Sequence, residues 1–237
     1  MNRKIIILLL GGLFCAVGMT SCGKDNVLSS LYKENNKEKA EDEIANGNYD
    51  SAISLLETYI SANPADYSAQ SMLANAYMLK AGIDLLTIII DLSHNIDDAK
   101  NNFYAILHSF PRGTQTNINY INTALQTLSA IPSSALTSDQ IFQTAMANVA
   151  LAFFTTSKDI LDSSGAISTT LVESMSVTDA DTIYNSLVNV QTNFISLGVV
   201  AGSGSGTGII LDIINQITST GGSTGPEKLA TFLIANA

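Results

Sequence analysis

The sequence predicts an all-α fold, and three observations support this. Apolar residues recur three or four positions apart over long stretches, which is the spacing of one face of a helix. Residues that favour helix starts stand before several of these stretches. No segment alternates apolar and polar residues for long enough to predict a strand. Because 46% of the residues are hydrophobic and only 14% are charged, we expect a packed core rather than a disordered chain.

The start of the chain has the pattern of a secretory signal peptide. Arg3 and Lys4 give it a positive charge, and an apolar run over residues 5–17 follows. The run is short and interrupted by two glycines, which argues against a membrane-spanning helix. Both cysteines of the chain, Cys15 and Cys22, lie here, so the remaining sequence can form no disulfide and no thiolate metal site.

The segment ends at Ser21 and Cys22, after a methionine and a threonine, and here the chain resembles a bacterial lipoprotein precursor. The resemblance implies cleavage between Ser21 and Cys22, removal of the signal peptide 1–21, and acyl chains on Cys22 at the head of a tether over 22–30. Several acyl chains anchor a soluble domain that one chain would hold only marginally. Gly23 stands where some lipoproteins carry an Asp that retains them at the inner membrane, so the resemblance implies an outer-membrane location in the bacterial cell envelope.

A helix-turn-helix pattern lies within residues 31–112. Gly47, Tyr49, Ala52 and Leu56 stand at fixed spacing around one turn, and Pro64 follows the second helix. The pattern resembles a tetratricopeptide repeat, a helix pair of about 34 residues in which small side chains let two helices approach closely. A second, weaker repeat follows. The residues that match the packing positions are Gly47, Tyr49, Ala52, Leu56, Pro64, Leu73, Ala74 and Tyr77.

The resemblance implies a TPR-like α-α superhelix in which the first helix of each repeat lines a concave binding surface. In this chain the surface is acidic at one end and apolar with amides at the other. The residues expected on it are Glu34, Lys37, Glu38, Glu41, Ser71, Met72, Asn75 and Met78. We expect it to hold a peptide segment or a helix of an envelope protein. The alternative is that these residues lie on an unused, solvated face.

Residues 113–237 continue the helical pattern without the repeat signature, and we expect them to pack on the first region. Thr137 and Gln140 form the pattern of a capping box before one of the helices. Thr178 with Asp181 starts another helix, and Pro226 after Gly225 opens the last. Helices are expected near 118–131, 141–154, 178–197 and 226–233, with a flexible connector at 202–208.

This C-terminal region carries few charges. After Arg112 its only cations are Lys158 and Lys228, and Ser, Thr, Asn and Gln replace the usual charged exterior. The composition indicates helices packed on several sides, with a polar-lined ligand groove as the alternative. It leaves open a second hypothesis, in which a small-molecule ligand binds and the chain resembles the accessory lipoproteins of solute transport systems.

Several function classes are disfavoured. The formal charge of −10 argues against nucleic-acid binding. The glycine-rich connector lacks the lysine and spacing of a phosphate-binding loop. Asp91, His94, Asp97 and Asp98 form the densest set of metal-ligand types, but helix capping explains them better. We therefore expect no catalytic residue, no metal and no cofactor, and we interpret the chain as a non-enzymatic, lipid-anchored adaptor or assembly scaffold.

Overall fold

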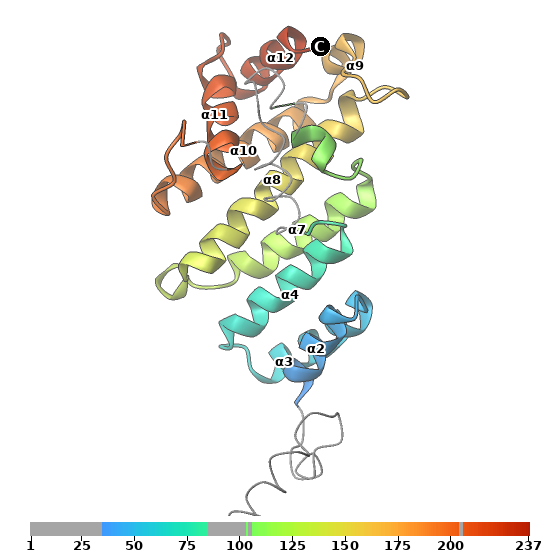
Figure 1. Ribbon diagram of the computed structural model, residues 1–237, viewed down its shortest axis with the longest axis vertical. Coiled ribbons are helices and arrows are strands. Elements are labelled where there is room, and N and C mark those ends of the chain that lie inside the picture. Colours follow the sequence, from blue (N-terminus) through green and yellow to red (C-terminus); the bar gives the residue numbers. More distant parts are fainter. Residues whose placement is uncertain (1–34, 85–102, 104–105, 204–205) are drawn as a thin grey trace, which may run out of the picture.

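The computed structural model describes residues 35–84, 103, 106–203 and 206–237. Within these residues every regular element is helical, and the one isolated β-bridge joins Leu161 to Ile167. The all-α prediction is confirmed. Figure 1 shows an elongated stack of helices, with α2 and α3 at one end and α11 and α12 at the other. None of the described helices is both long and apolar enough to cross a membrane.

Three helices, α2 (Asn36–Ala45), α3 (Tyr49–Ala62) and α4 (Tyr67–Lys80), follow one another through short turns. Gly47 closes the first turn with a φ of 77°, a left-handed conformation that costs glycine little. Its N–H donates to the Ile44 carbonyl (3.0 Å), and the Asn48 N–H donates to the Glu43 carbonyl (2.8 Å). This pair of bonds is a Schellman motif, which ends α2 and starts α3 within three residues.

A small apolar cluster holds these three helices together. Most of its buried members are alanines, which let the helix backbones approach closely. The buried members are Ala40, Ala52, Ile53, Leu56, Ala69, Leu73 and Ala76. The opposite side of α4 carries Ala74 and Met78, which belong instead to the main core. Helix α4 therefore contributes to two separate apolar clusters.

The main core surrounds α8 (Ser138–Ile160), which packs against α7 (Gln115–Ser129) and α10 (Val177–Ser196). The predicted capping box is present at its start: the Thr137 N–H donates to the Gln140 side chain at 3.0 Å, and the Gln140 N–H donates to the Thr137 hydroxyl at 3.3 Å. The helix is longer than predicted, and it is buried on several sides because two helices cover it. Polar residues on the covered sides bond to their own helix, as the Thr156 hydroxyl does to the Ala152 carbonyl at 2.7 Å.

The remaining elements complete the C-terminal end of the stack. They are the 3₁₀ turn η1 (Ser133–Ala135), α9 (Thr169–Ser174), α11 (Gly206–Ser219) and α12 (Gly225–Ala235). The predicted start of α10 at Thr178 is wrong, because the side chain of Ser176 caps the helix by accepting from the Asp179 N–H at 3.0 Å. Helix α11 begins at Gly206, so the last three residues of the connector predicted at 202–208 are helical.

Candidate binding surfaces

The α2 end of the predicted partner surface consists largely of side chains with structural bonds. Lys37 donates to both carboxylate oxygens of Asp66, at 2.9 and 3.1 Å. The Glu38 carboxylate accepts from the Asn35 N–H at 3.0 Å and completes the capping box of α2. Glu41 is exposed, and Glu34 lies outside the described residues. Lys37 and Glu38 thus hold α2 in place, and Glu41 is the acidic side chain most open to a partner.

Asp66 is the point at which α2, α3 and α4 are tied together. Besides the two bonds from Lys37, it accepts from the Tyr59 hydroxyl at 3.1 Å and from the Ala69 N–H at 3.0 Å. Partial burial by itself raises the pKa of the Asp66 carboxyl, but the hydrogen bonds that it accepts outweigh burial and lower the pKa below its usual range. The ionised form is therefore the one that stabilises the fold.

We expect Asp66→Asn to destabilise the protein by about 1 kcal/mol at neutral pH, because asparagine keeps the helix cap but loses the ion pair. Since the folded pKa of Asp66 is depressed, its contribution is complete above the unfolded pKa of about 3.9. It is lost as the pH falls through the folded pKa. The difference in urea midpoint between wild type and Asp66→Asn should therefore shrink on acidification. Asp181→Asn, at an exposed carboxylate on α10, is the control. A pH-independent difference would contradict the role of the charge.

The α4 end of the predicted surface faces α8. Ser71 donates from its hydroxyl to the Gln143 side chain at 2.6 Å, and Gln143 donates back to the Ser71 carbonyl at 2.9 Å. A shallow groove of about 470 Å³ opens beside this pair. It is lined by Ser68, Ser71, Met72, Asn75, Asp139, Phe142 and Gln143. The structure thus brings three of the predicted residues together with α8, which the repeat pattern did not predict.

The prediction that Met78 contacts a partner is wrong. Its side chain is 0% exposed and lies in the main core. The repeat pattern assigns this face of α4 to an open concave surface, but α7 and α8 pack against it. The open part of the predicted surface on α4 is therefore restricted to Met72, Asn75 and the edge of Ser71.

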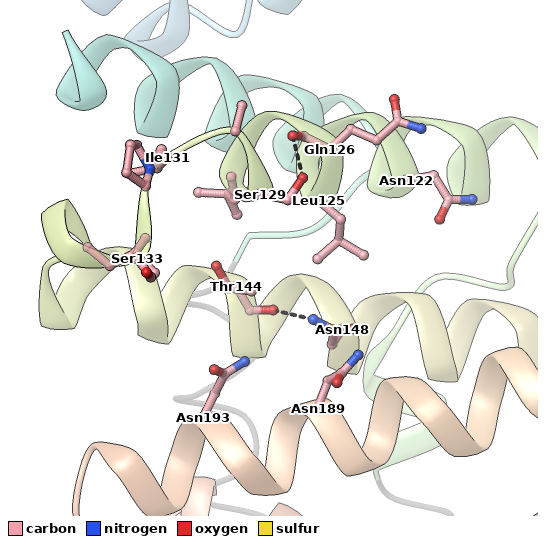
Figure 2. A pocket seen from close by; sticks show the side chains of 14 residues that line it. Asn122, Leu125, Gln126, Ser129, Ile131, Ser133, Thr144, Asn148, Asn189 and Asn193 are labelled. Carbon is pink, nitrogen blue, oxygen red and sulfur yellow. Dashed lines mark hydrogen bonds between the residues drawn. The ribbon is translucent and has the colours of Figure 1, made fainter. Parts of the chain in front are cut away.

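A larger cleft, of about 830 Å³, lies between α7, α8 and α10 (Figure 2). Its polar lining consists of carboxamides and hydroxyls from all three helices and from the chain after α7. Neither a charged nor an aromatic side chain is among the described residues that line it. The lining residues are Asn122, Leu125, Gln126, Leu128, Ser129, Ala130, Ile131, Pro132, Ser133, Leu136, Thr144, Asn148, Asn189 and Asn193. We call this site the amide-lined cleft.

Each helix of the amide-lined cleft contributes one pair of polar residues four positions apart: Asn122 with Gln126, Thr144 with Asn148, and Asn189 with Asn193. Because residues four apart share a helix face, each pair points the same way, as Figure 2 shows for Asn189 and Asn193. Asn148 is 5% exposed and donates to the Thr144 carbonyl at 2.9 Å. Within the described chain, the carboxamides of Asn189 and Asn193 make no hydrogen bond with another protein group, so they are available to a ligand.

The sequence indicated a polar-lined groove only through the low charge of residues 113–237. A sharper signal was present, because Asn122 with Gln126 and Asn189 with Asn193 place amides on one face of each of two helices. What the sequence did not reveal is that these two faces line one cleft, on either side of α8.

The other candidates from the sequence give no site in the described part of the chain. Asp91, His94, Asp97 and Asp98 lie outside the described residues, as do Ser21 and Cys22. Among the residues that are described, no group of three or more His, Cys, Asp or Glu side chains is placed to hold a metal ion. Comparisons of the chain with protein-family models, with curated proteins and with solved structures find no match.

Proposed function

We propose that the protein is a non-enzymatic adaptor or assembly scaffold of a bacterial envelope, anchored through lipid on Cys22, with the outer membrane as its location. The observation that carries the proposal is the groove between α4 and α8. There, Met72 and Asn75, which the repeat pattern assigns to a partner-binding surface, meet Phe142 from a distant part of the chain. The partner is an envelope protein or a peptide segment of one.

The proposal includes a TPR-like superhelix for the N-terminal region. Gly47 takes the left-handed conformation in the turn between α2 and α3, and Ala52 and Leu56 are 0% exposed on the second helix of that pair. On α4, where the weaker repeat pattern begins, Leu73 is buried in the small cluster and Ala74 in the main core. Ala52, Leu56 and Leu73 support the repeat because small and apolar side chains occupy the contacts between consecutive helices.

The chemistry of the groove suits an amphipathic segment of a partner. Met72 and Phe142 offer an apolar centre, and methionine adapts readily to different partner side chains. Asn75 and Asp139 stand beside them as polar and acidic edges. A segment with an apolar side chain for the centre and a polar or basic residue for the edge would match this surface.

A second candidate is a ligand-binding accessory lipoprotein of a solute transport system. It is favoured by the amide-lined cleft, because an uncharged lining suits a neutral ligand. The two candidates use different surfaces, so they are separable by mutation.

In-cell photo-crosslinking tests the adaptor proposal. A photoreactive amino acid placed at position 75 of the full chain should capture one envelope protein in stoichiometric amount, because this position lines the groove. The same group at Ser61, which is exposed on α3, should not. Met72→Asp should abolish capture at position 75 by placing a charge in the apolar centre.

The unanchored control is Cys22→Ala, which should move the protein from the membrane to the soluble fraction and remove the crosslink with it. Capture that is equal at positions 75 and 61, or that survives Met72→Asp, would contradict the groove as the binding surface. Retention of Cys22→Ala in the membrane fraction would contradict the lipid anchor.

A further inference from the structure

The amide-lined cleft is suited to a ligand without formal charge. Asp139 is the only charged residue between Gly113 and Ser157, and it lies outside the cleft. On α10, the charged residues Asp179 and Asp181 lie at the start of the helix, away from the lining residues. An ionised ligand would lose part of its hydration here without gaining an opposite charge, which is costly. A neutral ligand that hydrogen bonds has no such cost.

The amides of the cleft match the chemistry of a peptide backbone. Each carboxamide presents N–H donors and a carbonyl acceptor, which is the pair of groups that a main-chain amide needs. Asn189 and Asn193 are four residues apart on α10, so they are spaced along the helix by about 6 Å. Two residues of an extended chain span about 6.6 Å. Alternate residues of an extended peptide would therefore meet successive asparagines.

The asparagines of α10 form one wall of the cleft, and residues of α7 form the opposite wall, which can bond to the other edge of the peptide. Asn122 and Gln126 stand at the same spacing on α7, across α8 from the asparagines of α10 (Figure 2). In an extended chain, main-chain groups of successive residues point to opposite edges. One wall would bond to residues i and i+2, and the other to residue i+1. Leu125 and Leu136 add apolar surface for side chains of the peptide.

We propose that the amide-lined cleft binds an uncharged peptide segment in extended conformation, held between the carboxamides of α7 and α10. The proposal goes beyond the adaptor function, which rests on the groove between α4 and α8. A carbohydrate is less well matched, because no aromatic side chain is among the described lining residues to stack on a sugar ring.

Peptide display tests the proposal on the full chain purified in detergent. A library of random eight-residue peptides should yield binders that lack Asp, Glu, Lys and Arg. One of these, acetylated, amidated and labelled with a fluorophore, is then used in anisotropy titrations. Neutral oligosaccharides serve as competitors and should not displace it. An empty selection, a selection dominated by charged peptides, or displacement by an oligosaccharide would overturn the proposal.

Matched variants locate the binding. Asn189→Leu with Asn193→Leu keeps the side-chain size but removes the amides, and it should weaken binding of the selected peptide by about tenfold or more. Asn185→Leu is the control, because Asn185 is exposed one turn earlier on α10 and does not line the cleft. Asn122→Leu tests the opposite wall and should also weaken peptide binding. Thermal unfolding followed by circular dichroism shows whether this variant keeps the fold. Equal affinity of the double variant and the control would overturn the assignment. If the double variant loses peptide binding but still gives the crosslink at position 75, the cleft and the adaptor groove are independent sites.

Discussion

Replacement of Gly113 with alanine is expected to destabilise the protein by about 3 kcal/mol, because the added methyl group has no room. Gly113 is buried where the chain enters α7 and crosses α8, and a Cβ atom built on it would lie 1.9 Å from the Phe154 carbonyl oxygen. The obstacle is helix backbone, which cannot turn aside as a side chain can. The Gly113 N–H also donates to the Ser157 hydroxyl at 2.8 Å, so a shift of the loop would break a buried hydrogen bond.

Urea unfolding followed by circular dichroism measures this effect. Gly221→Ala is the matched control, because a Cβ atom at Gly221 meets nothing within 4 Å. The control should unfold within about 0.5 kcal/mol of the wild type. Equal midpoints for Gly113→Ala and Gly221→Ala would show that the loop before α7 does not approach α8 as closely as described.

Replacement of Phe194 with alanine is expected to cost about 3–5 kcal/mol of stability. The ring is 0% exposed and stacks on Phe142 of α8, with 6.3 Å between centroids and 22° between planes. It therefore fastens α10 to the central helix. Alanine would remove both the buried area and the aromatic contact, and the rigid helices around it would leave a cavity.

The neighbouring residue provides the control for this substitution. Ile195 is 60% exposed on the same helix, so Ile195→Ala should change the free energy of unfolding by no more than about 0.5 kcal/mol. Both variants are compared by urea midpoint after their helical content is checked. A Phe194→Ala protein as stable as Ile195→Ala would contradict the packing of α10 on α8.

The fold was predictable from sequence where local signals and burial agree. The Thr137 and Gln140 pair predicted the start of α8 because a capping box depends only on residues within one turn. The burial of Asn148 and Thr156 was not predictable, because each bonds to its own helix and resembles a solvent-facing residue until α7 or α10 covers it. That covering depends on contacts between helices far apart in the chain.

The same distinction applies to the candidate binding surfaces. Met72 and Asn75 line the groove between α4 and α8, and the sequence offered them through their spacing within one helix. Met78 was misplaced because helices from the second half of the chain cover it. The amides of α10 were visible in the sequence as a periodic set. Whether the amides of α10 and α7 line the same cleft depends on how α7, α8 and α10 pack together, and no local sequence rule gives that geometry.

Helix α4 has buried residues in both apolar clusters, and it is the helix through which the two clusters are joined. Ala69 and Ala76 face the small cluster with α2 and α3, while Ala74 and Met78 face the large one. The small cluster is a separate packing unit, so a local opening of α2 and α3 would leave the packing of α4 on α7 in place.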